Sequence, residues 1–89
     1  MKHILLIALS LTIAAPAVAC DDAEQFIMAG NECQQFVRKF GPDMWQGEAC
    51  TSMERYKRAM HHCHKPVTQD QLQRIEWLNK HLKDVGYKL

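Results

Sequence analysis

The sequence predicts an all-α protein, and three observations carry this prediction. Apolar residues recur at intervals of three and four within three separate segments, which is the period of an α-helix. No segment alternates apolar and polar residues, as a half-buried strand would. Four cysteines can cross-link a chain of 89 residues, whose core is too small to be stable alone. We therefore expect a disulfide-stapled antiparallel helical hairpin followed by a third, C-terminal amphipathic helix.

Residues 1–19 have the three parts of a cleavable signal peptide. A short positive start precedes an apolar run, residues 4–15, which is too short to cross a hydrocarbon layer of about 30 Å. Pro16 breaks the helix, and Ala17-Val18-Ala19 matches the small-residue cleavage site. Cleavage before Cys20 leaves residues 20–89 as a single small helical domain, which we expect in the periplasm.

The same cleavage region can also be interpreted as a lipoprotein box, with Cys20 as the lipidated residue. Such boxes usually carry a larger aliphatic residue where Ala17 stands. Lipidation would also leave three cysteines, an odd number, in an oxidising compartment. We expect no membrane association unless Cys20 is lipidated.

The net charge after processing excludes one class of partner. The chain has eleven Lys and Arg and ten Asp and Glu, and the signal segment removes only Lys2 from this count. Residues 20–89 are therefore nearly neutral when histidine is neutral. Nucleic-acid binding needs an excess of basic side chains for phosphate contacts, so we expect no nucleic-acid partner.

The cysteine spacing favours one disulfide pattern among the three that four cysteines allow. In an antiparallel hairpin, paired residues lie equally far from the turn. The pairs Cys33–Cys50 and Cys20–Cys63 are both centred between Gly41 and Pro42, the strongest interior turn signal. We therefore predict these two nested disulfides. No CxxC spacing suggests a metal-thiolate site instead.

Each half of the hairpin has a helical stripe. In the first, over residues 22–40, the stripe is formed by Phe26, Ala29, Cys33, Phe36 or Val37, and Phe40. In the second it is formed by Ala49, Met53, Tyr56, Met60 and Cys63. Acidic residues open the first helix and basic residues close the second, as helix dipoles prefer. The hairpin should bring these two charged ends together.

The third helix has the clearest boundaries. Thr68 and Gln71 have the spacing of a capping box, and Gly86 is a suitable left-handed terminator. The apolar face between them is formed by Leu72, Ile75, Leu78, Leu82 and Val85.

A histidine cluster near the end of the second helix is the best candidate for a metal site. On a continued helix, His61 and His64 would share a face, with Asp21 or Asp22 nearby, which suggests zinc or copper. However, Cys63 is committed to a disulfide, and cations at a helix C-terminus have a simpler electrostatic explanation. We therefore expect no metal or other cofactor. Under the alternative interpretation, in which a metal is bound, His61 and His64 are its ligands.

The mature sequence favours binding over catalysis. Ser52 is its one serine, and no nucleophile and base can be paired when every cysteine is bonded. Tryptophan is enriched at binding hot spots, and the pattern leaves both tryptophans partly exposed. The predicted partner-binding residues are Trp45, Trp77 and a basic patch of Arg55, Arg58 and His62. Surplus aromatic residues can also be buried in a homodimer.

Three segments resemble a known family. Residues 26–32 place an aromatic residue shortly before a Gly-Asn pair, Cys50 and Cys63 flank the central helix, and residues 66–72 read Pro-Val-Thr-Gln-Asp-Gln-Leu. This order resembles the Rap/Tai family of periplasmic immunity proteins of type VI secretion systems, over residues 26–72. The resemblance implies an exported all-α protein, commonly dimeric, that caps a peptidoglycan amidase effector and is not itself an enzyme.

Two alternatives come from other classes of protein. One is a small structural component of an envelope or conjugation apparatus, anchored through a lipid on Cys20. The other is a periplasmic metal-binding protein that uses His61 and His64.

Overall fold

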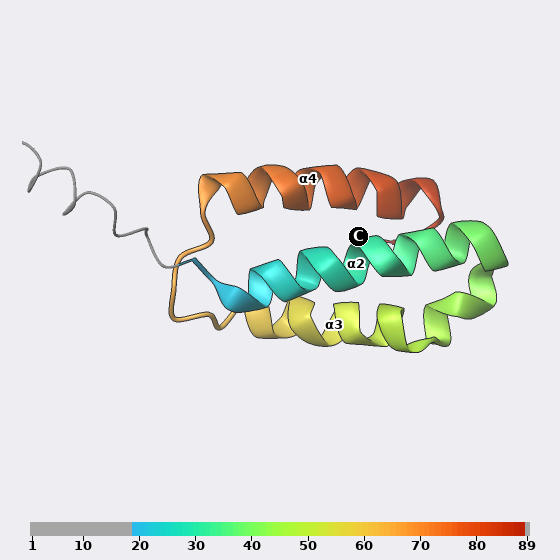
Figure 1. Ribbon diagram of the computed structural model, residues 1–89, viewed down its shortest axis with the longest axis horizontal. Helices are drawn as coiled ribbons and strands as arrows, with labels where there is room; N and C mark the ends of the chain where they lie inside the picture. Colours follow the sequence, from blue (N-terminus) through green and yellow to red (C-terminus); the bar gives the residue numbers. More distant parts are fainter. Residues whose placement is uncertain (1–18, 89) are drawn as a thin grey trace, which may run out of the picture.

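A computed structural model describes residues 19–88 of the protein (Figure 1). The signal-peptide prediction falls on residues that lie almost entirely outside this range. Three α-helices and one short 3₁₀-helix make up the described part, and none of its residues is in a strand. In chain order these are α2 (Asp21–Phe40), η1 (Pro42–Gln46), α3 (Glu48–Met60) and α4 (Gln69–Asp84). The predicted all-α class is confirmed.

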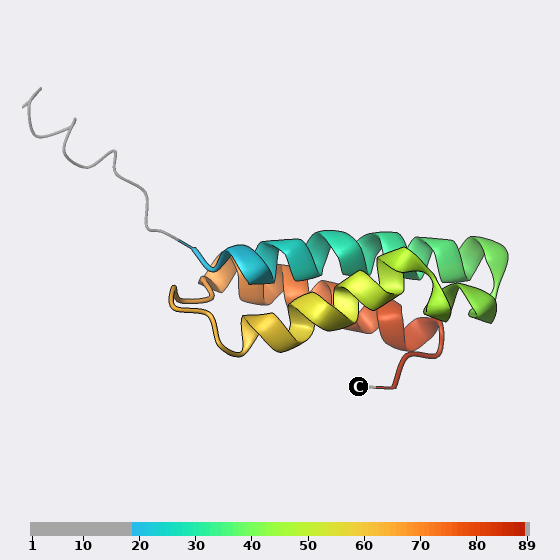
Figure 2. The same cartoon turned by 90° about the horizontal axis from the view of Figure 1, so that it is seen from below.

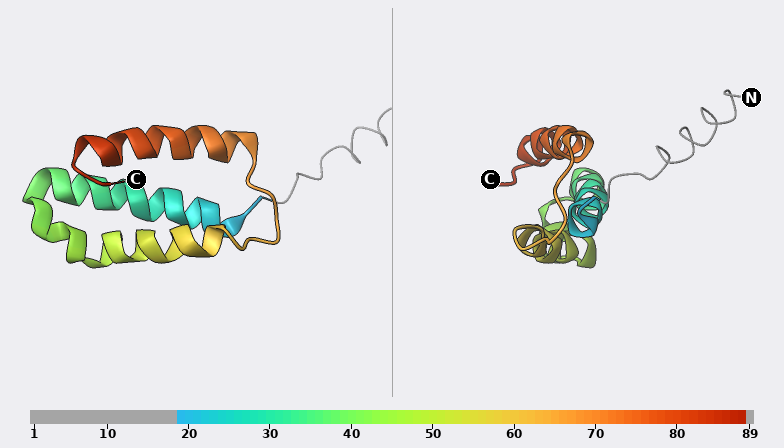
Figure 3. Two further views of the ribbon diagram at one scale, coloured as in Figure 1. Left: turned by 180° about the vertical axis from the view of Figure 1, so that it is seen from behind. Right: turned by 90° about the vertical axis from the view of Figure 1, so that its left-hand side faces the viewer.

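Helix α2 is the central element of the fold. Helix α3 runs antiparallel to it, and α4, after the connection over residues 61–68, runs parallel to it (Figures 1 and 2). The backbones of both α3 and α4 come close to α2, while the backbones of α3 and α4 stay farther apart from each other. Seen along the helices, the three elements form an open V with α2 at the bend (Figure 3). The predicted hairpin is therefore α2–α3, and α4 extends it on the opposite side of α2.

Both predicted disulfides are present. Cys33–Cys50 joins the middle of α2 to α3, with Cα atoms 4.7 Å apart, and Cys20–Cys63 closes the open end of the hairpin at 6.0 Å. No cysteine among the described residues is free. Because the Cys20 sulfur is bonded to Cys63, it is not available for a lipid, which argues against the lipoprotein alternative. Two disulfides indicate folding in an oxidising, exported environment.

The helices within residues 19–88 are too short or too polar to span a lipid bilayer. The core that holds them together is small. Its fully or nearly buried apolar residues are Cys20, Ala23, Phe26, Cys33, Val37, Cys50, Met53, Leu78 and Leu82. Cysteines make up a third of this set, so the disulfides are themselves part of the core.

Three residues assigned to apolar stripes turn out to be exposed. Phe36 and Phe40 on α2 are 42% and 60% exposed, and Leu72 on α4 is 45% exposed. For Phe36 and Leu72 a neighbour one residue away faces the core instead, since Val37 and Gln71 are buried, whereas Phe40 is the last residue of α2. Successive residues on a helix point about 100° apart, so a stripe wider than the actual contact includes residues that remain in solvent.

The helix ends follow the predicted chemistry with one exception. Thr68 and Gln71 form the capping box, and Gly86, at φ 100°, ends α4 with the two hydrogen bonds of a Schellman motif. Helix α3, however, ends at Met60 and does not reach Cys63. The amides of residues 61, 62 and 63 donate to carbonyls three residues back, and this tighter turn closes the helix early.

Gly30 allows α2 and α4 to approach closely. A Cβ atom at this position would lie 2.5 Å from Cδ2 of Leu78 and 3.2 Å from its Cδ1. Leu78 is fully buried, so it has little freedom to move away. Gly30 has ordinary helical dihedral angles, so the reason for a glycine here is the close packing of Leu78 and not the backbone conformation.

Removing either disulfide is expected to destabilise the protein in proportion to the loop that it closes. In the chain-entropy description, C20A/C63A should lower the free energy of unfolding by about 4 kcal/mol and C33A/C50A by about 3 kcal/mol. The order follows from sequence separations of 43 and 17 residues. Urea denaturation monitored by circular dichroism measures both values. The reverse order would mean that packing around Cys33 and Cys50 outweighs chain entropy.

Replacing Gly30 by valine is expected to lower stability by about 2 kcal/mol, the usual cost of overpacking a filled core. Gln35→Val on the exposed side of the same helix is the matched control, since it introduces the same β-branched residue without a neighbour to displace. Thermal unfolding of the two variants separates packing from helix propensity. Equal losses would show that α4 is not held against Gly30.

Candidate functional site

The most unusual surface feature is a group of large apolar side chains exposed on α2 and α4. Met28 and Trp77 are 59% and 50% exposed, and Phe36 lies two helical turns after Met28 on the same side of α2. Small proteins rarely leave several such side chains on one contiguous surface without a partner. We call the surface around Met28, Phe36 and Trp77 the docking face.

Two grooves adjoin each other at Met28 and make the docking face continuous. The first, about 250 Å³, lies between α2 and α4, with Ile27, Met28 and Asn31 on one side and Arg74, Trp77 and Leu78 on the other. The second, about 380 Å³, lies between α2 and α3. Its lining residues are Gln25, Met28, Ala29, Glu32, Phe36, Glu48, Ala49, Ser52 and Tyr56. Met28 is the shared wall, so one partner can contact both grooves.

Trp77 is held in place by its own helix. The His81 ring lies 3.9 Å from the Trp77 ring, centroid to centroid, and tilted by 30°. The Nδ1 atom of His81 is 2.9 Å from the Trp77 carbonyl oxygen, which fixes the imidazole when Nδ1 carries the proton. A side chain that is already ordered loses less entropy on binding, so this stack would lower the entropic cost of a contact made by Trp77.

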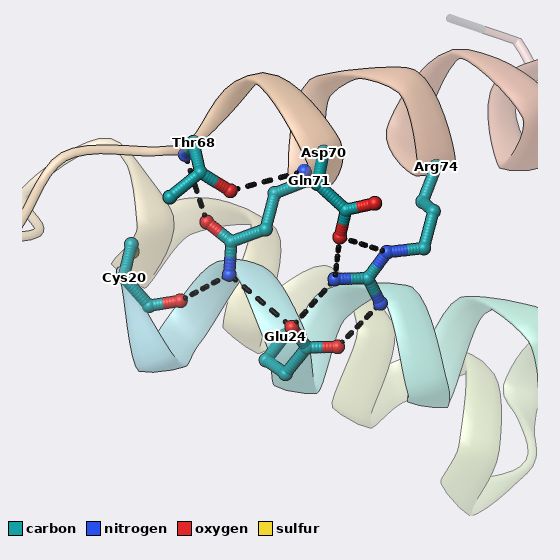
Figure 4. A network of polar contacts seen from close by, with 6 residues as sticks. All are labelled: Cys20, Glu24, Thr68, Asp70, Gln71 and Arg74. Carbon is teal, nitrogen blue, oxygen red and sulfur yellow. Dashed lines mark hydrogen bonds and ion pairs between the residues drawn. The ribbon is translucent and has the colours of Figure 1, made fainter. Parts of the chain in front are cut away.

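A polar network next to the first groove fixes α4 on α2 (Figure 4). Arg74 donates to both carboxylate oxygens of Glu24, at 2.6 and 2.8 Å, and to Asp70 at 3.0 Å. The amide of buried Gln71 donates to the Cys20 carbonyl at 2.9 Å and to Glu24 at 3.3 Å. Arg74 lines the groove beside Trp77, so the network also sets the position of the docking face.

This network changes the acidity of Glu24. The hydrogen bonds from Arg74 are the largest cause that lowers the Glu24 pKa, and the Gln71 amide adds to them, while partial burial opposes both. The pKa of Arg74 is raised, mainly by the same bond to Glu24. Glu24 and Arg74 were not identified from the sequence, because they are separated by fifty residues and match no local motif.

Trp45, one of the predicted contact residues, lies half-buried against the end of the core. Its ring is 5.6 Å from the Tyr87 ring, which the turn at Gly86 brings over α3. The Tyr87 hydroxyl donates to Glu54 and accepts from Lys57, and burial is the largest cause that raises its pKa, followed by the bond to Glu54. A surface pocket of about 440 Å³ lies beside this pair. Glu54 and Tyr87 line it and are bonded to each other, and Trp45 packs on Tyr87, so Trp45 contributes to the fold here and its contact role remains a prediction.

The predicted basic patch lies on α3. Arg55 and Arg58 are exposed, and His62 is exposed in the turn after the helix. Within residues 19–88 none of the three makes an ion pair. Arg55 donates to the Ser52 hydroxyl at 3.2 Å, and Ser52 lines the second groove, so Arg55 sits at the edge of the docking face. Trp77 is separated from this patch by α2.

The geometry assumed for a metal site is wrong. Helix α3 ends at Met60, so His61 and His64 do not share a helical face. Asp21 and Asp22 do lie in a pocket with His62 and His64, but no three His, Cys, Asp or Glu side chains among the described residues are arranged to hold a metal ion. The expected meeting of charged helix ends is present, since Lys65 lies 3.9 Å from Asp21.

Comparison of the chain with protein-family models, with curated proteins and with solved structures finds no match.

The lowered pKa of Glu24 predicts acid sensitivity. The Glu24 carboxylate binds a proton less tightly in the folded protein than in the unfolded chain. Its contribution to the free energy of unfolding is therefore complete above the ordinary glutamate pKa and is lost as pH falls through the lower pKa of the folded state. Because the carboxylate is 40% exposed, we expect the contribution to be below about 1 kcal/mol.

Urea denaturation between about pH 5 and pH 3 measures this loss. Glu24→Gln should reduce stability at neutral pH and flatten the acid slope. Glu76→Gln, an exposed change on α4 without an ion pair in the described residues, should leave the slope as it is. Parallel curves for the native protein and Glu24→Gln would contradict the assignment.

Proposed function

We propose that the protein is an exported binding protein that attaches to a partner protein through the docking face. The observation that supports this most directly is the exposure of Met28, Phe36 and Trp77 around two adjoining grooves. Apolar and aromatic side chains in well-shaped pockets supply most of the binding energy at protein interfaces. The stack on His81 gives Trp77 the fixed position that such a contact needs.

The proposed partner is a peptidoglycan amidase effector of a type VI secretion system, which the protein neutralises by capping it. The support for this choice is the resemblance of residues 26–72 to the immunity family and the export indicated by two disulfides. An inhibitor that acts by covering its target needs a rigid surface and no chemistry of its own.

Pull-down from the periplasm of the source organism tests the partner. The oxidised mature protein serves as bait, and M28A/W77A serves as the parallel bait with the docking face removed. The proposal expects the native bait alone to retain a peptidoglycan amidase, whose activity then falls when the protein is added. Recovery of secretion or conjugation components only, or an amidase that stays active in the complex, would overturn it.

Trp77→Ala is expected to weaken the complex by about thirtyfold, the loss typical of a hot-spot tryptophan of about 2 kcal/mol. Lys80→Ala, an exposed change on the same helix, is the matched control and should bind as the native protein does. Titration calorimetry with the purified partner measures both. If the two variants bind equally well, Trp77 is not at the centre of the interface.

A further inference from the structure

The groove between α2 and α3 has an unusual combination of walls. Met28 and Phe36 stand on the α2 side, Ala49 and Tyr56 on the α3 side, and about 380 Å³ between them is not filled by the described chain. The two aromatic rings face a space that is wide enough for a side chain of a partner. The apolar walls alone favour any apolar group.

Charge makes the groove selective. Glu32 from α2 and Glu48 from α3 both line it, and neither is in an ion pair within residues 19–88. No Lys, Arg or His side chain lines the groove to balance them. By contrast, Glu24 beside the neighbouring groove is neutralised by Arg74. The α2–α3 groove therefore has two carboxylates that form no ion pair within the described residues, next to aromatic faces, while Arg55, a basic side chain at its edge, is bonded to Ser52.

An arginine side chain fits this combination better than other residues. Its planar guanidinium stacks on aromatic rings and donates to carboxylates in pairs, so Phe36, Tyr56 and the two glutamates can all contact it. Lysine offers a compact charge with less stacking, and an acidic group would be repelled.

The shape of the groove indicates the element that would carry the arginine. Met28 and Phe36 are eight residues apart on one helix, which corresponds to about 12 Å or two turns. A partner helix lying along α2 presents apolar residues at the same two-turn spacing, with polar residues between them. Glu32 lies midway between Met28 and Phe36, where a side chain between the two anchors would arrive.

We propose that the α2–α3 groove binds an amphipathic helix of the partner protein, with two apolar anchors two turns apart and an arginine between them. This inference rests on the proposed function and specifies the chemistry of the partner. The apolar anchors pack on Met28 and Phe36, and the guanidinium lies between Glu32 and Glu48.

Three synthetic helical peptides of about five turns test the proposal without the natural partner. The first has two leucines two turns apart with an arginine between them on an alanine-based background. The second replaces the arginine by glutamate, and the third replaces both leucines by alanine. Fluorescence anisotropy measures binding to the oxidised mature protein. The first peptide is expected to bind at least about tenfold more tightly than either of the others.

Charge variants locate the contact. E32Q/E48Q should weaken the arginine peptide by about tenfold, while E76Q/D84N, which changes net charge equally on α4, should not. Thermal unfolding confirms that both variants fold. Equal weakening by both would mean non-specific charge attraction and would overturn the proposal. So would equal binding of the three peptides.

Sedimentation of the protein alone excludes a different occupant. A dimer that dissociates in M28A/F36A and competes with the peptide would assign the groove to a second copy of the chain, which overturns the proposal. Failure of this proposal can be distinguished from failure of the proposed function. If no amidase complex forms, the peptide result still stands. If the protein binds the three peptides equally well, the effect of Trp77→Ala on the amidase complex is unchanged.

Discussion

The fold depends on the covalent and hydrogen-bonded junction at Cys20. Its sulfur is bonded to Cys63, its amide donates to the Pro66 carbonyl, and its own carbonyl accepts from Gln71. The same residue caps α2, where its sulfur accepts from the Ala23 amide at 3.4 Å. One fully buried residue thus joins the start of α2, the end of the hairpin and the start of α4. A chain with so few large buried side chains cannot hold three helices by apolar burial alone, so this junction and the Cys33–Cys50 bridge set their positions.

Placing α2 between two helices whose backbones stay apart has a consequence for the surface. Helix α2 buries its stripe of Phe26, Cys33 and Val37 against both neighbours, and no third helix among the described residues covers its outer side. The outer side nevertheless carries Met28 and Phe36. A sequence selected only for solubility would place polar residues there, because exposed apolar groups promote association. Their exposure on the central helix supports the binding role proposed for this side.

Much of the fold could be predicted because its signals are local or symmetric. The two disulfides followed from equal spacing about one turn, and the ends of α4 from a capping box and a glycine. The rotation of each helix does not follow from the sequence in the same way, since Phe36 and Val37 are both apolar and only packing decides which is buried. The contact of Gly30 with Leu78 and the ion pair of Glu24 with Arg74 connect residues about fifty positions apart. Neither has a local pattern, so neither could be found from one sequence.

For the site, tryptophan chemistry identified Trp77, but Met28 and Phe36 became significant only when α2 and α3 formed a groove around them.

Acidic and basic side chains of α3 meet at the edge of the α2–α3 groove, and this limits what the groove can bind. Glu48 lines the groove with Glu32, and Arg55, seven residues later and so nearly on the same side of α3, donates to Ser52 at the edge of the groove. A partner helix in the groove would meet carboxylates along its own axis and guanidinium groups at its edge. Like charges placed opposite one another at an interface weaken the binding free energy by about 2 kcal/mol or more. The partner surface that satisfies both is basic along one helix and acidic on the side that faces Arg55. This alternation discriminates against uniformly basic peptides and uniformly acidic proteins, and it gives a small apolar face the selectivity that burial alone does not provide.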